Sequence, residues 1–264
     1  MVTKNKIDLA AGAQTVDRAC ELLRAIARTG AQGIRILDLC NGSGLSRPTV
    51  HRILRSLQVA ALVQQSPENR RYSLGTGMFE LGMAAPNPIT RFPQVRSIVE
   101  ELAARTNDTV YLMLRSYEDV LCAWRAQGAY PIKANVVALG NRRPLGASVA
   151  GIGILSSLPE DESDLLIEAN GPYLSDFCKM TAADVSRHVQ DARSKGYAVG
   201  VNAVMEGVTA VGVAVPASYQ LPFMALSVSA ISARITLERV PELVDQLKRT
   251  AEKIAAITFS HISA

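Results

Sequence analysis

The chain has 264 residues and a formal net charge of +4; 48% of its residues are hydrophobic and 20% are charged. This composition excludes a disordered chain and supplies enough apolar side chains for sizeable cores, and the length favours two domains over one. No apolar run reaches the roughly 18 residues that a membrane span requires, and no secretory signal is visible at the N-terminus, so we expect no membrane association and a cytoplasmic location.

The positive charge is concentrated in the first quarter of the chain. Residues 1–75 contain eleven Lys or Arg and five Asp or Glu, a net charge of +6, whereas residues 76–264 have a net charge of −2. A segment with such an excess of cations either binds an anionic partner or presents a solvated basic surface. Charge alone leaves both interpretations open.

Cysteine and histidine usage argues against metal and disulfide chemistry. The four cysteines are scattered and form no CxxC pair, and none of the three histidines lies near one of them. We therefore expect no metal site, no cofactor and no disulfide framework. Cys122 lies in an apolar run and is predicted to be a buried structural residue.

The N-terminal quarter predicts a set of short helices. Apolar residues recur at helical spacing over residues 15–28, and Gly30 follows the end of that helix. A second helix is predicted at residues 36–41. We expect Gly42 and Gly44 to break it and to allow the tight turn of a helix-turn-helix.

The third predicted helix, residues 46–57, separates an apolar face from a basic one. Ser46 suits the N-cap and Pro48 suits the first turn. The apolar residues follow the i, i+3, i+4, i+7 pattern of one buried stripe: Val50, Ile53, Leu54 and Leu57. The basic residues lie on another face, with no acid among them: Arg47, His51, Arg52 and Arg55. Because arginine donates paired hydrogen bonds to guanine or phosphate, this helix is predicted to bind DNA.

A hairpin is predicted directly after this helix, over residues 62–74. Two strand-like runs flank the turn cluster Ser66-Pro67-Glu68-Asn69, and Arg70 and Arg71 are expected on the return strand. Three helices followed by a basic hairpin is the order of a winged helix-turn-helix. We assign it to residues 10–75 and place a linker, helical at its start, at residues 76–90.

The remaining residues, 91–260, mix strands and helices in a way that favours an α+β domain with an antiparallel sheet. Strands are predicted at 109–116, 120–124, 132–139, 208–216 and 223–230. Helices are predicted at 96–105, 148–157, 159–169, 182–195 and 240–257. Thr181 with Asp184 gives a capping pattern at the start of the helix at 182–195, and Gly196 closes it.

No catalytic motif accompanies these elements. The sequence contains no GxGxxG, GxxxxGK[ST], GxSxG or HExxH, so we expect no enzyme activity. Ser227 and Ser229 alternate with apolar residues and point to one side of a strand. They belong either to a solvated sheet face or to a small-molecule cavity. The alternative function is a small-molecule enzyme or sensor whose basic N-terminal module does not bind DNA specifically.

Several segments, in order and spacing, resemble the IclR family of bacterial transcriptional regulators. They are TVDRACELLRAIA, GLSRPTVHRILRSL, RRYSLGTGMFELG, PLGASVAGIGILSSL, KGYAV, MEGVTAVGVAVP and ALSVSAISARIT. The resemblance implies a winged helix-turn-helix, a linker helix and a GAF-like effector-binding domain. It also implies homodimers or homotetramers that bind palindromic, double-stranded promoter DNA and respond to a small organic or aromatic acid.

The resemblance also implies site residues. The recognition helix falls on residues 46–57 and the wing on residues 62–74. The implied DNA-contacting residues are Arg47, Thr49, His51, Arg52 and Arg55, with Arg70 and Arg71 on phosphate or in the minor groove. The implied effector-binding residues are Ser148, Val149, Ala150, Ala210, Ser227 and Ser229.

The sequence departs from the family pattern at several of these positions. Residues 200–203 replace a usual cluster of acids, Ala210 replaces a cysteine found in some members, and Val149 replaces a frequent small residue. These changes imply a more apolar pocket. Arg143 stands where the family commonly has an apolar residue, and we hypothesise that it pairs with an effector carboxylate, the alternative being a solvated loop arginine.

Overall fold

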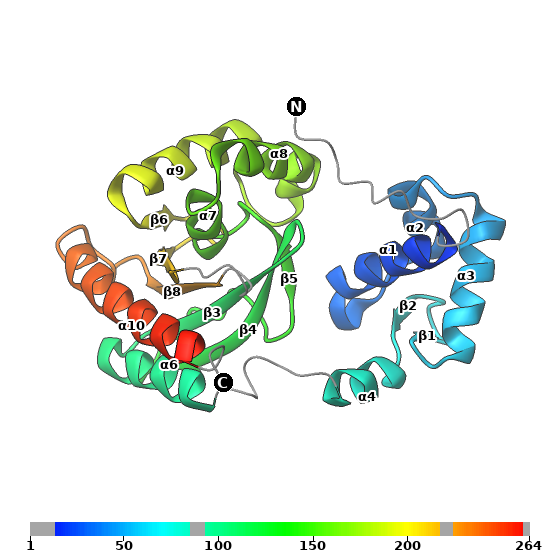
Figure 1. Ribbon diagram of the computed structural model, residues 1–264, viewed down its shortest axis with the longest axis horizontal. Coiled ribbons are helices and arrows are strands. Elements are labelled where there is room, and N and C mark those ends of the chain that lie inside the picture. Colours follow the sequence, from blue (N-terminus) through cyan, green and yellow to red (C-terminus); the bar gives the residue numbers. More distant parts are fainter. Residues whose placement is uncertain (1–13, 85–92, 217–223, 261–264) are drawn as a thin grey trace. The chain divides into compact units, whose positions relative to one another are not determined.

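The computed structural model describes residues 14–84, 93–216 and 224–260 and divides into two compact units, residues 1–87 and 88–264 (Figure 1). The later part of the expected linker and the first residue of the strand expected at 223–230 lie outside the described residues. Within the described residues, no helix combines the length and the apolar character needed to cross a membrane.

The N-terminal unit has the predicted helix-turn-helix followed by a hairpin. Its elements are α1 (Gln14–Arg28), the 3₁₀ turn η1 (Gly30–Gln32), α2 (Ile36–Ser43), α3 (Arg47–Val59), β1 (Val63–Gln65), β2 (Tyr72–Leu74) and α4 (Thr76–Ala84). The predicted apolar stripe of α3 is fully buried and packs against Leu22 and Ile26 of α1. The backbone of Ile34 pairs with that of Tyr72 and joins the hairpin to the helices.

The turn between α2 and α3 differs in detail from the prediction. Helix α2 continues through Gly42 to Ser43, so Gly42 does not break it. Gly44 alone does so, with a left-handed φ of 65° that a side chain would strain. Residues 44–46 therefore form the whole turn that sets α3 against α2.

The C-terminal unit is built on one antiparallel sheet with the strand order β5-β4-β3-β8-β7-β6. The strands are β3 (Thr109–Ser116), β4 (Asp119–Gln127), β5 (Arg142–Pro144), β6 (Ala198–Val201), β7 (Val208–Ala214) and β8 (Met224–Ile231). Helices α6 (Pro93–Thr106) and α10 (Val240–Ser260) cover one face, and α7 (Val149–Ser156) covers the other (Figure 1). Helices α8 (Glu160–Asn170) and α9 (Ala182–Lys195) pack outside α7, and η2 (Gly171–Asp176) follows α8.

Alternate residues of strands β3, β7 and β8 pack in two separate cores. On β3, Val110 and Leu112 pack with α6 and α10, whereas Tyr111 and Met113 face α7. The two-residue period of a strand requires this division. The α+β class and the antiparallel sheet that we predicted are confirmed.

The predicted strand at residues 132–139 is wrong. Residues 128–141 form an irregular segment between β4 and β5, which we call the β4–β5 loop. Its β-branched residues suggested a strand, but side chains from β3, β4 and β5 bind the backbone carbonyls of Ala134, Val136 and Val137 in place of a neighbouring strand. Strand β6, which the sequence did not predict, instead lies at the opposite edge of the sheet.

A buried carboxylate joins the start of β3 to the segment between β8 and α10. The side chain of Asp108 is 1% exposed and lies 2.7 Å from Nε of Arg234 and 2.8 Å from Nη2 of Arg239. The guanidinium of Arg234 also stacks on the ring of Tyr130, 3.9 Å from its centroid. These contacts tie together three segments far apart in the sequence.

Candidate functional site

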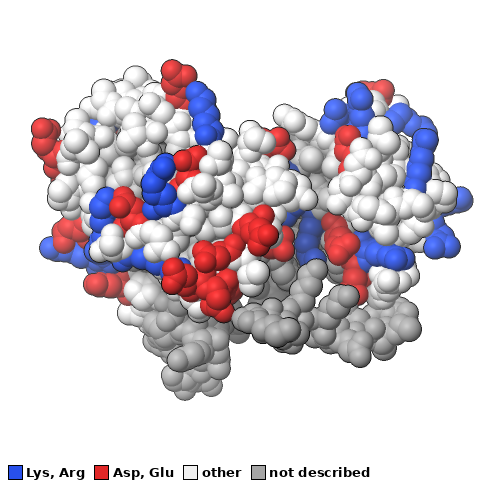
Figure 2. Space-filling view, turned by 90° about the horizontal axis from the view of Figure 1, so that it is seen from above, with Lys and Arg blue, Asp and Glu red and all other residues white. Residues whose placement is uncertain are grey.

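The exposed face of α3 carries only basic and neutral side chains. Arg47, His51, Arg52 and Arg55 are all exposed, and together with Pro48 they line a shallow, open groove. Figure 2 shows Lys and Arg side chains along the right-hand edge of the N-terminal unit, at the place that α3 occupies in Figure 1. The basic surface is thus brought together by one helix whose opposite face is anchored in the core.

The first turn of α3 positions Thr49 differently from the arginines. Ser46 occupies the N-cap position with extended backbone, but its hydroxyl lies 2.9 Å from that of Thr49 and caps no backbone N–H. Thr49 is half-buried. Its hydroxyl is therefore oriented by Ser46, at the edge of the basic groove.

The two wing arginines take unequal positions, and both precede β2 instead of lying on it, contrary to the prediction. Arg70 is exposed in the turn, with a φ of 59°. Arg71 is half-buried and donates a hydrogen bond of 2.9 Å from Nη1 to the carbonyl oxygen of Gly33. Arg70 is free to meet a partner, whereas Arg71 also fastens the hairpin to the segment before α2.

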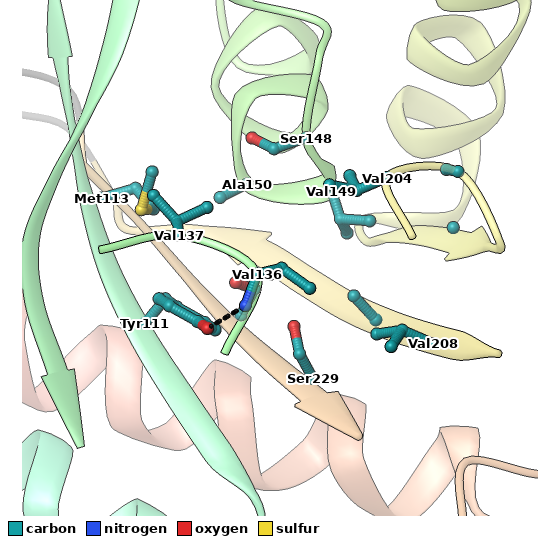
Figure 3. A pocket seen from close by; sticks show the side chains of 14 residues that line it. Tyr111, Met113, Val136, Val137, Ser148, Val149, Ala150, Val204, Val208 and Ser229 are labelled. Atoms are coloured by element: carbon teal, nitrogen blue, oxygen red, sulfur yellow. Dashed lines mark hydrogen bonds between the residues drawn. The ribbon is translucent and has the colours of Figure 1, made fainter. Parts of the chain in front are cut away.

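A cavity lies in the C-terminal unit between α7, the β4–β5 loop and strands β3, β6, β7 and β8 (Figure 3). It encloses about 480 Å³ of space between its lining atoms, its open mouth included. Its lining comprises Tyr111, Met113, Val136, Val137, Ser148, Val149, Ala150, Gly200, Ala203, Val204, Val208, Ala210, Ser227 and Ser229. Six of the seven residues predicted to bind an effector are therefore brought together; the exception is Arg143.

The cavity is mostly aliphatic with a few hydroxyl groups. Ser227 and Ser229 are only 6% and 3% exposed, so their predicted side of β8 faces this cavity and not solvent. The hydroxyl of Ser148 accepts a hydrogen bond of 3.1 Å from the N–H of Gly151 and caps α7. No charged side chain belongs to the lining. Such a site suits a ligand with an apolar body and one or two polar groups.

Sequence reasoning missed the lining residues on the β4–β5 loop and on β3, and also Gly200, Ala203, Val204 and Val208 on and between β6 and β7. The side-chain alternation of β3 predicts that Tyr111 and Met113 share one face of the sheet. It does not predict which residue of β8 lies beside Tyr111. That pairing follows from the register between β3 and β8, in which Tyr111 faces Ser227. A single sequence carries no signal for such a register.

The hydroxyl of Tyr111 holds the loop wall of the cavity. It donates to the carbonyl of Ala134 at 2.7 Å. It also accepts from the N–H of Val136 at 3.0 Å (Figure 3). Arg125 adds a bond of 3.2 Å to the carbonyl of Val137. Burial raises the pKa of Tyr111, so its hydroxyl keeps the proton that it donates.

Arg143 lies behind this wall. Its guanidinium donates to the carbonyl of Val136, the residue that Tyr111 binds through its N–H. Burial lowers the pKa of Arg143, because the charged guanidinium loses hydration. Arg143 is thus a half-buried cation next to the cavity, not the solvated loop arginine considered as its alternative.

Metal-ligating side chains do not gather at one place among the described residues. Among them, no group of three or more His, Cys, Asp or Glu side chains could hold a metal ion. Cys122 is fully buried, as predicted, and burial raises its pKa to about 11, so the thiol is protonated and unreactive near neutral pH.

Two family models match the chain. The model of the IclR helix-turn-helix domain matches residues 15–67, and that of the bacterial transcriptional regulator IclR C-terminal domain matches residues 92–256. The chain is 26% identical over 239 residues to the HTH-type transcriptional regulator XynR of Escherichia coli, covering 89% of this chain and 93% of that one. It is 25% identical to the acetate operon repressor of Salmonella typhimurium, covering 91% and 88%.

Solved structures share the fold. An IclR family transcriptional regulator from Brucella abortus has a TM-score of 0.75 at 20% identity, covering 94% of this chain and 97% of that one. An IclR homolog from Microbacterium hydrocarbonoxydans, solved in complex with 4-hydroxybenzoate, has a TM-score of 0.62 at 18% identity, covering 92% and 99%. With both domain models matched in order, the chain belongs to the IclR family of bacterial transcriptional regulators.

Proposed function

We propose that this protein is a ligand-responsive regulator that binds palindromic promoter DNA and is controlled by a small organic or aromatic acid. The observation that carries the proposal is the combination of an acid-free basic face on a helix-turn-helix with a mostly apolar cavity in a second unit. A regulator needs both parts, and the ligand must bind one DNA-binding state better than the other.

The DNA-binding part of the proposal assigns α3 to the major groove. Arg47, Arg52 and Arg55 would supply paired donors to guanine edges or phosphates, with His51 and Thr49 beside them. Arg70 would meet phosphate or the minor groove at the wing. Arg71 would do so with the N–H groups that its bond to Gly33 leaves available.

The ligand part of the proposal follows from the cavity's chemistry. Its aliphatic walls favour an apolar body, and the hydroxyls of Ser227 and Ser229 supply hydrogen bonds. The start of α7 at Val149 and Ala150 presents backbone N–H groups, which favour a carboxylate. The 4-hydroxybenzoate complex of the Microbacterium homolog supports an aromatic acid as the class to test.

A homodimer or homotetramer completes the proposal, because a palindromic site matches a two-fold protein. Helix α4 supports self-association, since Phe79, Leu81 and Met83 are 70%, 60% and 72% exposed. Large apolar side chains that gather on one short helix are usually covered by a partner. A second copy of this chain would cover them.

The proposal predicts salt-dependent, sequence-preferring DNA binding that an acid modulates. By fluorescence anisotropy, the full-length protein should bind DNA from upstream of its own gene at least about 1,000-fold more tightly than scrambled DNA, and more weakly as salt rises. A thermal-shift screen of organic and aromatic acids should then identify one that changes this affinity, since a ligand at 100 times its Kd stabilises the folded state by about 2.7 kcal/mol. Equal affinity for both DNAs would favour the alternative of a small-molecule enzyme or sensor.

The proposed pairing of Arg143 with the carboxylate predicts a charge-specific loss. Arg143→Ala should weaken binding of the acid from the screen by roughly 10- to 150-fold and spare its neutral amide, since a hydrogen bond to a charged group is worth about 1.5–3 kcal/mol. Isothermal titration calorimetry measures both ligands. If Arg143 acts only by holding Val136, acid and amide weaken equally. Arg142→Ala is the matched control, because Arg142 donates to the hydroxyl of Ser116.

A further inference from the structure

We propose that Val149 sets the upper size limit of the ligand, because its two methyl groups occupy the space that Gly200 and Gly212 leave beneath the start of α7. The inference rests on the proposed function in one respect, namely that the cavity binds a ligand. It adds the residue that decides how far such a ligand extends toward β6 and β7.

Val149 is placed to limit the cavity. It is the first residue of α7, it is 4% exposed, and it lines the cavity between the smaller side chains of Ser148 and Ala150. Figure 3 shows its side chain directed from the start of α7 into the space above the strands. It is therefore the bulkiest group that the start of α7 contributes to the lining.

Two glycines accommodate the methyl groups of Val149. A Cβ atom on Gly200 would lie 2.8 Å from Cγ2 of Val149, and one on Gly212 would lie 3.0 Å from Cγ1. Neither glycine has a positive φ, so the backbone conformation does not demand glycine at either position. Val149 is the nearest obstacle to a side chain at both positions; the next are Cβ of Ala203 at 3.3 Å from the Cβ on Gly200, and the backbone oxygen of Leu226 at 3.2 Å from the one on Gly212.

The strand register places this contact next to the polar floor of the cavity. Gly200 pairs with Ala210 across β6 and β7, and Gly212 pairs with Ser227 across β7 and β8. A Cβ atom on Gly212 would also lie 3.4 Å from Cβ of Ser227. Removing the methyl groups of Val149 would thus join the volume above both glycines to the cavity beside Ser227.

The shape of valine suits a residue that limits the length of a ligand. A β-branched side chain in a helix has one strongly preferred χ1 rotamer, so Val149 cannot turn aside as a longer, unbranched side chain would. Alanine at position 149 should admit an additional ring or branch on the ligand. Alanine at position 200 should press Val149 toward the interior of the cavity and exclude ligands that the wild type binds.

The proposal is tested in the full-length protein with two aromatic acids of different size and with xenon. Titration calorimetry measures the affinities for benzoate and for 2-naphthoate, and methyl NMR under xenon pressure measures the apolar space without reference to any acid. V149A should raise the affinity for 2-naphthoate relative to benzoate by about 10- to 200-fold, the range for such a change in an apolar pocket. G200A should weaken both acids, and the double variant V149A/G200A should restore binding, because the two positions share one contact.

The controls separate the two ways in which the test can fail. V189A removes the same atoms from the adjoining core on α9, outside the cavity lining, and should leave the ratio unchanged. An unchanged ratio in V149A overturns the proposal. If no variant binds either acid, the proposed class of ligand is wrong, and the xenon measurement tests the size limit by itself. More xenon bound in V149A and less in G200A supports the size limit. Equal xenon binding in all variants overturns it.

Discussion

Replacing Arg47, Arg52 and Arg55 together with alanine should abolish specific DNA binding by the full-length protein. These side chains are exposed on the acid-free face of α3, whereas the opposite face forms the core. A plot of the logarithm of the DNA association constant against the logarithm of the salt concentration has a negative slope. Each lost arginine that neutralises a phosphate should make this slope less negative by about 0.9. The N-terminal unit should stay folded, because surface substitutions away from the core usually change stability by within about 0.5 kcal/mol.

Single substitutions then assign roles to the three arginines. If an arginine reads a base, its alanine variant should bind the operator roughly 5- to 150-fold more weakly, which corresponds to about 1–3 kcal/mol. Its affinity for scrambled DNA should change little. An arginine that holds phosphate should weaken both equally. Arg249→Ala is the control, because Arg249 is an exposed helical arginine of α10 with a side chain that is 75% exposed. Unchanged operator binding by the triple variant would rule out α3 as the DNA-reading helix.

Asp108→Asn should destabilise the C-terminal unit by about 3–5 kcal/mol. The substitution leaves Arg234 and Arg239 without the carboxylate that both of them contact, in a site where that carboxylate is 1% exposed. Breaking a buried ion pair costs this much because the remaining charge stays desolvated. The arginines are themselves 24% and 21% exposed, so water screens part of the loss and the lower end of the range is expected.

The single tryptophan makes this measurement specific to one unit. Trp124 lies on β4, so its fluorescence during urea unfolding reports the C-terminal unit and not the helix-turn-helix. Asp245→Asn is the control, since Asp245 is 57% exposed and pairs with Arg249 within one helix, a contact worth about 0–1 kcal/mol. Equal losses in the two variants would show that the three-residue cluster adds no special stability.

Local patterns in the sequence were sufficient for much of the fold. The buried stripe of α3 follows from its helical spacing, and α9 begins and ends where Thr181, Asp184 and Gly196 predict, with both reciprocal bonds of the capping box present. These features depend on residues within one or two turns of each other. Short-range geometry decides them, so a single sequence carries their signal.

The conformation of the β4–β5 loop and the position of Arg71 were not predicted, because both depend on contacts between residues far apart in the sequence. Residues 132–139 have strand-like composition, but a tyrosine more than twenty positions away binds their backbone. The side chain of Arg71 donates a hydrogen bond to the carbonyl of Gly33, 38 positions earlier in the chain. Such contacts arise only when distant segments meet, and propensity yields to tertiary context there.

The β4–β5 loop also separates two kinds of stability in the C-terminal unit. Four side-chain hydrogen bonds from Tyr111, Arg125 and Arg143 hold the loop wall of the cavity. At about 0.5–1.5 kcal/mol each they contribute roughly 2–6 kcal/mol, to which the burial of Ala134 and Val137 adds. Because the wall takes no part in the strand pairing between β3 and β8, the loop can move while the sheet stays intact. We therefore expect substitutions in the β4–β5 loop to change the shape of the cavity more than the pairing of the strands beneath it.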